Sequence, residues 1–548
     1  MEVFKLKLDR SVWLSLLGQD KLLEAYESFN IYFNNLLKHK RKNGIKEEID
    51  LCQKIFYTTL FEKNKKYIEQ EDYNQALIAS NILFKIDNLH IDSIKLYLKA
   101  LAKTNQKDLC KDMIAYLKII TNDDKDFYKY FANIFNEIKD YENAIKYLED
   151  YINFKPKEEI LADDYNWLGC YYTYLYNVNF ELSDLEKSIE LFLCAYKIES
   201  WNKLYLKNLA VMTKVKKDKK TARKYWNEIL AKFPLSNDDK WEYMTFCLEE
   251  GNFEEYFKYI DSRFVKSEKV YFPKLSGKKW NGIENISDST LLIYCIQGYG
   301  DTILYSGYLP RLKNMAKKII CLVQDSLLPL FSNNNYGIEI LPIGDTNVIS
   351  LQYDYYIPST DVLKVLQVNR NTLSVDTDFI KLDNEEIEKV RKLYFNNDKL
   401  KIGLSCYGSQ LNSKERNLPL DKIVCLDDIN NAEFYILNKE FDDKHLPQNT
   451  KNRFINLGKT FNNFKDTAIA IKNCDLILST DNNILNLAGV LGKKTYGLFN
   501  WRPEFRWFDL TGEDVVWYKS VKPFVNEKMN DWSSSINKVV DLINDGNK

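Results

Sequence analysis

The stretch that decides the fold of this chain is LLIYCIQGYGDT, residues 291–302, which leads from an apolar run into a helix-like segment at 303–318. The apolar half of this stretch predicts a buried strand. Gly298 and Gly300 then allow a tight turn that brings the backbone and the carboxylate of Asp301 close to a ligand. The motif lacks the third glycine of the dinucleotide-binding fingerprint, so it predicts a ligand-binding loop without naming the ligand.

Length and charge narrow the class of protein. A chain of 548 residues is too long for one core, so several domains are expected. The 77 Lys and Arg residues balance the 78 Asp and Glu residues, which leaves no basic field for nucleic acid. No apolar run is long enough to span a membrane, and Asp9 and Arg10 interrupt the N-terminal apolar segment. These features predict a cytoplasmic protein without a membrane span.

Cysteine and histidine usage argues against a metal site or a catalytic triad. The ten cysteines are scattered, with no close pair and no metal-ligand spacing, which predicts buried, reduced thiols. The three histidines, His39, His90 and His445, form no motif with an acid or a cysteine. We therefore expect no metal and no resident cofactor.

The first half of the chain has the spacing of a helical repeat array. Within 125–158, large residues, small residues and a proline fall where the 34-residue tetratricopeptide pattern places them. The matching residues are Tyr128, Phe131, Ala132, Phe135, Ala144, Leu148 and Pro156. A later unit repeats the phase with Leu209, Ala210, Ala222, Trp226 and Pro234. The segment 55–262 thus resembles tetratricopeptide repeats, with an insertion that bends or bulges the array at 176–184 and a terminal cap at 241–259.

Stacked helix pairs of this kind form a concave surface that usually binds a polypeptide. The alternative is that the array only spaces or oligomerises another domain. Residues 1–54 are also helix-rich, and the apolar spacing from Leu22 to Leu36 suggests a docking helix.

After residue 264 the periodicity changes to short apolar runs that alternate with amphipathic stretches. The first series of candidate strands is 291–296, 318–323, 338–341 and 353–357. The second series is 401–406, 433–437, 453–457, 476–479 and 495–499. Such alternation predicts two parallel sheets with crossovers, that is, two Rossmann-like lobes with a cleft between them.

Ligands in open α/β sheets bind at the carboxyl ends of the strands, so the loops after residues 296, 406 and 479 should converge on the cleft. The first loop carries Gln297, Gly298, Gly300, Asp301 and Thr302. The second carries Tyr407, Gly408, Ser409, Lys414 and Arg416, a cationic set suited to phosphate. The third carries Thr480, Asp481, Asn482 and Asn483 and opens a helix whose N-terminus can hold a nucleotide diphosphate.

These residues, taken in order, resemble the bacterial glycosyltransferase family 9, the heptosyltransferase-like enzymes, in the version fused behind tetratricopeptide repeats. The resemblance covers about 273–536. The matching pieces are Trp280 and Gly282, the 297–302 loop, Tyr308 to Leu312, Ile402 to Leu404, Arg416 to Leu420, Asp466 to Ala468, Ser479 to Asp481, Asn486 to Gly492, Pro503 to Trp507, and Asp531 with Trp532.

The resemblance implies a GT-B fold and an inverting, metal-independent transfer from a nucleotide-sugar. It implies an acceptor-side lobe at 263–385 and a donor-side lobe at 395–548. Asp301 matches the acid proposed as general base, and the alternative is that it only caps the following helix. Lys414 and Arg416 match the cationic loop that neutralises the leaving diphosphate.

The resemblance also implies roles for the third loop and for the segment that follows it. Asp481, Asn482 and Asn483 match positions that hold the donor's phosphates and ribose. Four residues, Trp501, Arg502, Arg506 and Trp507, could shape the donor or acceptor end, although the aromatic pair could equally be core.

One departure from the family bears on activity. The repeat-fused relatives usually have Asp-Thr-Ala-x-x-His-Leu-Ala-Gly at the positions of residues 481–489. In this chain Asn482, Asn483 and Asn486 replace the Thr, the Ala and the His. Amides keep hydrogen-bonding capacity but cannot hold a charge. An unusual donor sugar and a decayed site both fit this change.

Three functions follow from the sequence. The first is a glycosyltransferase that modifies Ser or Thr of a protein acceptor, such as a flagellin or adhesin, recruited by the repeats. The second keeps the chemistry but uses a lipid-linked or surface glycan as acceptor. The third is a non-catalytic repeat scaffold with a vestigial or sensing transferase domain.

Overall fold

The computed structural model describes residues 2–38, 45–263, 275, 277–295, 297–334, 336–344, 351–377, 379–408, 416–446, 453–507 and 517–546. The chain divides into two compact units, Met1–Tyr225 and Trp226–Lys548. The described part of the first unit is helical, and all described strands lie in the second. This arrangement confirms the expected α plus α/β class. The division falls earlier in the chain than residue 262, where the sequence predicts the end of the repeats.

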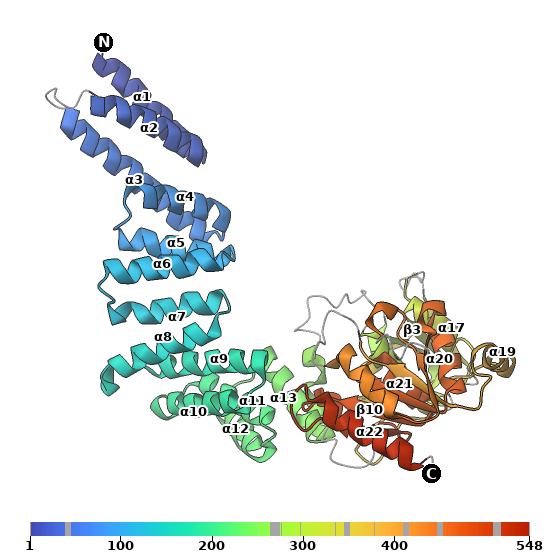
Figure 1. Ribbon diagram of the computed structural model, residues 1–548. Coiled ribbons are helices and arrows are strands. Elements are labelled where there is room, and N and C mark those ends of the chain that lie inside the picture. The colour runs from blue at the N-terminus through green and yellow to red at the C-terminus, as the bar shows by residue number, and fades with distance from the viewer. Residues whose placement is uncertain are drawn as a thin grey trace. The chain divides into compact units, whose positions relative to one another are not determined.

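The first unit consists of successive antiparallel helices (Figure 1). They are α1 (Glu2–Gly18), α2 (Leu22–Lys38), α3 (Ile45–Glu69), α4 (Tyr73–Ile86), α5 (Ile91–Lys103), α6 (Lys107–Ile120), η1 (Lys125–Phe127), α7 (Tyr128–Glu137), α8 (Tyr141–Phe154), η2 (Lys157–Glu159), α9 (Ala162–Asn179), α10 (Leu182–Ile198) and α11 (Lys203–Val215). Helix α12 (Lys219–Lys232) contains the division between the units.

The 34-residue period appears in the backbone of the turns. Glu71, Asn105 and Lys139 each end a hairpin turn in the left-handed region, with φ of 60°, 58° and 60°. Successive members of this set are 34 residues apart. Asp72 and Asp140 follow two of these turns, and each accepts a hydrogen bond from the backbone N–H three residues on, which fixes the start of the second helix. The repeat pattern therefore extends back to α3, beyond its clearest matches at 125–235.

Small residues hold the helix pairs together as the pattern requires. Ala132 and Ala144 are fully buried between α7 and α8. A side chain at Gly169 would come within 2.8 Å of the Phe192 ring, so only glycine fits where α9 packs on α10. The predicted insertion at 176–184 lengthens this hairpin, since α9 has 18 residues and α10 has 17.

The N-terminal segment is part of the helical stack. Phe29 of α2 stacks on Phe56 of α3 at 4.3 Å, and Trp13 of α1 packs edge-on against both rings. The apolar face of α2 is thus already covered by neighbouring helices. The apolar spacing that suggested a docking helix is therefore used to pack α2 against its neighbours in the stack.

The second unit begins with a helical pair and continues as two sheets. The pair comprises α13 (Asn237–Glu249), α14 (Phe253–Tyr259) and η3 (Ile260–Ser262). It is joined to the first sheet by ionic contacts: Asp361 accepts from Arg263, and Lys279 lies 3.0 Å from Asp361 and 2.6 Å from Asp261. These residues belong to the α/β unit even though their helical spacing resembles the repeats.

The first sheet has five parallel strands in the order β1-β5-β2-β3-β4. The strands are β1 (Lys278–Lys279), β2 (Ile286–Tyr294), β3 (Ala316–Val323), β4 (Ile338–Pro342) and β5 (Tyr355–Pro358). The elements between or after them are α16 (Tyr299–Ser306), η4 (Leu309–Leu312), η5 (Asp325–Leu327), α17 (Leu328–Phe331), η7 (Ser359–Asp361), α18 (Val362–Val365) and α19 (Asn384–Tyr394).

The second sheet has six parallel strands in the order β8-β7-β6-β9-β10-β11. The strands are β6 (Leu400–Ser405), β7 (Ala432–Ile436), β8 (Phe454–Asn456), β9 (Leu476–Thr480), β10 (Thr495–Phe499) and β11 (Val521–Val525). They alternate with η9 (Leu420–Asp428), η10 (Asp443–His445), η12 (Gly458–Thr460), α20 (Phe464–Asn473), α21 (Asn483–Val490), η13 (Phe505–Trp507) and α22 (Trp532–Gly546). In chain order this is the 3-2-1-4-5-6 arrangement of a Rossmann sheet.

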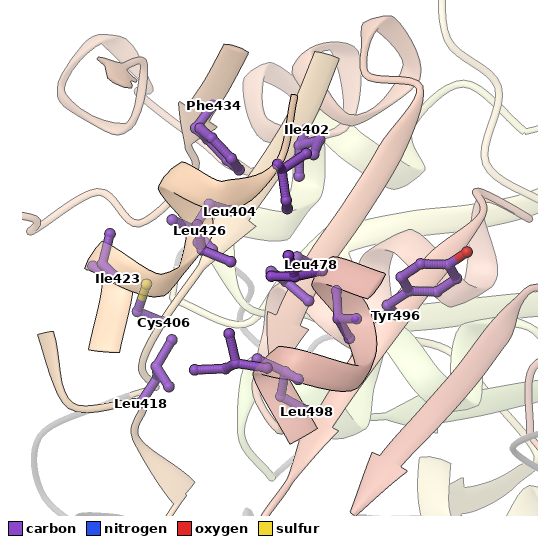
Figure 2. Packing of buried hydrophobic residues seen from close by; sticks show 14 of the residues in the cluster. Ile402, Leu404, Cys406, Leu418, Ile423, Leu426, Phe434, Leu478, Tyr496 and Leu498 are labelled. Atoms are coloured by element: carbon purple, nitrogen blue, oxygen red, sulfur yellow. The ribbon is translucent and has the colours of Figure 1, made fainter. Parts of the chain in front are cut away.

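The two sheets therefore form the expected GT-B-like α/β fold. The core of the second sheet is made of aliphatic side chains from β6, β9, β10 and η9 that point toward one another (Figure 2). Leu404, Leu478 and Ile423 are fully buried there. Helix α22 packs on β10 and β11 and closes this core from one side (Figure 1).

Two local expectations were wrong. The helix-like segment at 303–318 is helical only to Ser306, because Gly307 and Pro310 interrupt it and β3 begins at Ala316. Strand β11, with Pro523 and two lysines in or beside it, was missed because it is a polar edge strand. Residue 273, where the resemblance to the family begins, lies outside the described residues.

Candidate active site

The strand order of the two sheets indicates where a ligand would bind. In the first sheet the order reverses between β2 and β5, and in the second it reverses between β6 and β9. A ligand binds outside the carboxyl ends of the strands at such a point, because the two flanking loops diverge there. The loops after β2, β6 and β9 are the three that the sequence predicts.

The loop after β2 is held by side chains of the first sheet. Gly298 is the N-cap of α16, and its carbonyl accepts from the N–H of Asp301 at 3.1 Å. Thr302 donates to Gln324 at 3.0 Å, and Gln324 donates to the carbonyl of Gln297 at 2.6 Å. Gln324, at the end of β3, thus fixes the loop and was not singled out in the sequence.

Asp301 lies in the first turn of α16, where a carboxylate is favoured by the helix dipole. Its side chain is not used to cap the helix in the way proposed as the alternative. Its Oδ1 instead accepts from Nη1 of Arg506, which comes from the other lobe. The side chain is 15 % exposed, so this carboxylate is held at the edge of a largely dry site.

The loop after β6 is fixed by Asn438 at the end of β7. Its Oδ1 accepts from the N–H of Cys406 at 2.9 Å, and its Nδ2 donates to the carbonyl of Tyr407 at 2.8 Å. The N–H of Gly408 donates to Asn417 at 3.2 Å. Ser409 and Lys414, predicted to line the site, lie outside the described residues.

The loop after β9 is organised by Asn482. Its Oδ1 accepts from the N–H of Ile484 at 2.8 Å, as an N-cap of α21, and its Nδ2 donates to Ser405 at 3.0 Å and to Thr480 at 3.2 Å. The amide therefore ties the two loops of the switch point to each other. Of the residues predicted to hold the donor, Thr480 and Asn482 are buried in this network, whereas Asn483 lines the adjoining cavity.

Asn486 is hydrogen-bonded within the second lobe and faces Gly300 of the first. Its Oδ1 accepts from the hydroxyl of Tyr518 at 2.6 Å, and its Nδ2 donates to the carbonyl of Asn482 at 3.2 Å. A Cβ atom at Gly300 would lie 3.0 Å from this Nδ2, which is a tight contact, so the second glycine of the loop allows α16 to pack closely on α21. The amide at 486 thus has a structural use in this chain.

A cavity of about 590 Å³ opens beside these loops. Aromatic rings and amides from both lobes line it, with Tyr299 and Ser326 from the first lobe. From the second lobe come Tyr407, Gly408, Leu437, Asn438, Lys439, Glu440, Phe461, Asn462, Asn463, Phe464, Thr467, Asn483 and Ile484. Burial raises the pKa of Tyr407 to about 12, so its phenol is neutral at pH 7 and offers a flat apolar face. A cavity of this size and lining is suited to a planar heterocycle with a sugar attached.

A chain of alternating charges runs from the loop after β2 to the loop after β9. Arg506 pairs with Asp301 and, through Nε, with Glu504 at 2.7 Å. Arg416 lies 3.5 Å from Glu504 and 3.4 Å from Asp481. Three carboxylates therefore share two guanidinium groups.

Burial and charge act in opposite directions on this cluster. Burial raises the pKa of Asp481, and Glu504 adds to the rise, while Arg416 and Arg506 oppose it. Burial lowers the pKa of Arg506, but Asp301, Glu504 and Asp481 more than offset this effect, so the pKa is raised well above its ordinary value. Arg506 is therefore a permanent cation in the site.

The rest of the 501–507 segment divides between the cluster and the core. Trp507 is buried and packs against Phe499 with ring centres 5.1 Å apart, so this tryptophan belongs to the core. Glu504 was not singled out in the sequence, although it lies between Pro503 and Arg506 in a segment that was. Its role depends on contacts 88 residues apart in the chain, for which the sequence holds no signal.

Two features are absent from the described residues. No helix among them is long and apolar enough to cross a membrane. No group of three or more His, Cys, Asp or Glu side chains in the described ranges is arranged to hold a metal ion.

No family model and no curated protein matches this chain. Among solved structures, it is similar to a glycosyl transferase family 9 protein from Veillonella parvula, at 13 % identity and a TM-score of 0.36 over 48 % of this chain and 92 % of that one. It is also similar to the ADP-heptose LPS heptosyltransferase II of E. coli, at 10 % identity and a TM-score of 0.36 over 47 % and 100 %. A third similar structure is MamA from Desulfovibrio magneticus, at 17 % identity and a TM-score of 0.27 over 32 % and 93 %.

The chain thus joins a tetratricopeptide-like helical array to a GT-B-like α/β unit. Family 9 proteins stand among the similar solved structures.

The raised pKa of Asp481 leads to a prediction about stability. The unfolded chain holds the proton of this carboxyl less tightly than the folded one, so ionisation favours unfolding as pH rises above 3.8. Asp481→Asn should therefore raise the free energy of unfolding at pH 7 by about 1.4 kcal/mol for each unit by which the pKa is raised.

The measurement is urea unfolding of wild type and variant at pH 4 and at pH 7. The difference between them should shrink at pH 4, because the folded wild-type protein takes up the proton of Asp481 more readily than the unfolded chain as the pH falls. A variant that is less stable than wild type at pH 7 would contradict the raised pKa of Asp481.

Proposed function

We propose that the protein is a glycosyltransferase that moves a sugar from a nucleotide-sugar to a hydroxyl group of a protein acceptor. The observation that carries this proposal is the joint placement of Asp301, Arg416 and the 590 Å³ aromatic cavity at the two switch points of one α/β unit. A carboxylate, a cation and a planar cavity are the groups that such a transfer needs.

In the proposed reaction, the nucleoside lies in the cavity between the rings of Tyr299 and Tyr407. Asp301 accepts the proton of the acceptor hydroxyl, and the oxygen forms a bond to the anomeric carbon of the sugar. The bond from that carbon to the diphosphate breaks, and its electron pair leaves with the diphosphate. Attack from the opposite side inverts the anomeric configuration.

Arg416 neutralises the charge that builds up on the leaving diphosphate. The positive end of the α21 dipole acts in the same sense, since Asn482 ties that helix end to the loop after β6. The reaction as proposed is metal-independent, with the role of Lys414 as a second cation resting on the sequence alone.

The proposed acceptor is a polypeptide, because the helical array holds a groove of its own. A cavity of about 380 Å³ is lined by polar and aromatic side chains of α5, α7 and α9. They are Lys99, Ala102, Lys103, Tyr130, Asn133, Ile134, Asn136, Glu137 and Trp167. Asn133 accepts from Tyr171 through Oδ1 at 2.7 Å, which turns its N–H groups toward other acceptors.

This groove offers what an extended peptide needs. Amide groups can bond its backbone, and Trp167, which is 42 % exposed, can cover an apolar side chain. An acceptor such as a flagellin or adhesin, modified on Ser or Thr, fits this architecture.

The first prediction concerns Asp301. Asp301→Asn keeps the shape of the side chain but removes the proton acceptor, so transfer should fall by about 10²–10⁴-fold while donor binding is kept. The donor class is first found by a thermal-shift screen of UDP-, GDP-, ADP- and CMP-linked sugars, since a ligand of the folded state raises its apparent stability. Transfer is then followed by intact-protein mass spectrometry of co-expressed acceptors.

Asp376→Asn is a matched control, because Asp376 pairs with Arg311 at 3.1 Å in the same lobe, away from the cleft loops. This variant should keep full transfer. Equal activity of Asp301→Asn and wild type would exclude Asp301 as the base, and the absence of transfer by wild type would favour the non-catalytic scaffold.

The second prediction concerns the groove. Trp167→Ala removes the largest exposed ring of the groove and should lower transfer to a protein acceptor by about tenfold through KM, with donor binding unchanged. Trp201→Ala is the control, because Trp201 is 71 % exposed and does not line the groove. If both variants transfer as wild type does, the acceptor does not use this groove and a glycan acceptor becomes the better reading.

A further inference from the structure

The paired arginines of the cleft have a use that the base and the cavity do not explain. The carboxylate of Glu504 forms ion pairs with both arginines, 2.7 Å from Nε of Arg506 and 3.5 Å from Nη1 of Arg416. One carboxylate thus stands between two guanidinium groups that come from different loops. Forked anions bind between paired guanidinium groups in the same way, and a diphosphate is such an anion.

The cluster is also short of positive charge. Asp301, Asp481 and Glu504 carry three negative charges against the two of Arg416 and Arg506, which leaves a net charge of −1. Asp481 is almost fully buried and the other four side chains are between 15 % and 33 % exposed, so their interactions are only partly screened. An anion that enters must displace a carboxylate from the arginines.

A diphosphate can do this because it brings more charge than one carboxylate and more oxygens to bond. Displacement of Glu504 would free both guanidinium groups. It would also draw Arg506 toward the diphosphate and away from Asp301.

The position of Arg506 matters for the proposed base. Its Nη1 donates to Oδ1 of Asp301, so one of the two oxygens that could accept a proton is already occupied. A carboxylate held in this way is a poor receiver for the proton of an acceptor hydroxyl. The base is therefore blocked while Arg506 stays on it.

Arg506 is otherwise firmly placed. The indole N–H of Trp517 donates to the carbonyl of Arg506 at 2.8 Å, and η13 packs against α13. The backbone is thus fixed on two sides, and the exchange of partners requires only rotation of a long side chain.

We propose that Arg506 is a catalytic cation that exchanges Asp301 and Glu504 for the donor's diphosphate, with Glu504 as the positioning residue that holds both arginines until the donor arrives. This inference rests on the proposed function, because it concerns the same transfer. Donor binding then has two effects. The diphosphate binds Arg416 and Arg506, which stabilise it as the leaving group, and Asp301 loses its ion pair with Arg506 and can accept a proton. The bond changes are those of the proposed reaction, with the proton on Asp301 and the electron pair on the diphosphate.

The alternative is that the ion pairs only stabilise the contact between the two lobes. The two roles predict opposite effects on anion affinity. If the ion pairs are only structural, a mutation that removes one would loosen the site, and the protein would bind anions less tightly. If the carboxylates compete with the donor, a mutation that neutralises one would free an arginine, and the protein would bind anions more tightly.

The test is calorimetric titration of the full chain with inorganic pyrophosphate, which requires no knowledge of the donor. Glu504→Gln and Asp301→Asn should each bind pyrophosphate about three- to tenfold more tightly than wild type, because each removes a charge-assisted competitor for Arg506. Arg506→Gln should bind at least about tenfold more weakly, and Arg506→Lys should recover part of the loss. Asp376→Asn, a matched change at the Arg311 pair, should leave the affinity unchanged.

Thermal melting of each variant shows whether it is folded, and the nearly isosteric Glu504→Gln variant carries the test if Arg506→Gln does not fold. Unchanged or weaker binding by Glu504→Gln and Asp301→Asn, or no pyrophosphate binding by any variant, would overturn the inference. Failure of the proposed function looks different: the affinities change as expected, but no sugar is transferred. Transfer with unchanged affinities would overturn the role of Arg506 alone.

Discussion

The ion pair between Asp301 and Arg506 is the interaction on which the arrangement of this site depends. It joins the first loop of one sheet to the segment that follows β10 of the other, so both lobes contribute to a single charged cluster. The remaining partners, Glu504, Arg416 and Asp481, continue the chain of charges across the cleft. A buried pair of this kind is costly unless each charge is matched, which is why the sharing of two guanidinium groups by three carboxylates points to a ligand.

The fold explains why these residues meet. Parallel strands place their carboxyl ends at one edge, and the reversal of strand order between β6 and β9 leaves a gap at that edge for a ligand. Asn438 and Asn482 then tie the loops at this point to each other through their side-chain amides. The result is a preorganised site whose loops are held by hydrogen bonds to the ends of the strands.

Much of this architecture is readable from the sequence. The nine predicted strands correspond to observed ones because buried parallel strands are continuous apolar runs, and the repeat phase is set by small residues such as Ala132 and Gly169. The loops around Asp301, Arg416 and Asp481 were found because each follows such a strand. The polar strand β11 and the short helix α16 were misjudged because an edge strand and a proline-broken helix lack those patterns.

The partners within the site could not be read in this way. The pairing of Asp301 with Arg506 spans 205 residues, and the use of Asn486 depends on Tyr518 and on the absence of a side chain at Gly300. The pair of Asp301 and Arg506 joins the two lobes, and Asn486 and Tyr518 are 32 residues apart within the second lobe. A single sequence carries no periodic signal for either contact. Two of the amides, Asn482 and Asn486, are hydrogen-bonded groups of the fold, and the third, Asn483, lines the cavity.

The most direct measurement is a crystal structure of the full chain with the nucleoside diphosphate that the donor screen identifies. We expect the nucleobase in the cavity beside Tyr407, the diphosphate in contact with Arg416 and Arg506, and Asp301 released from Arg506. A diphosphate bound elsewhere, or one bound there with Arg506 still paired to Asp301, would contradict this expectation.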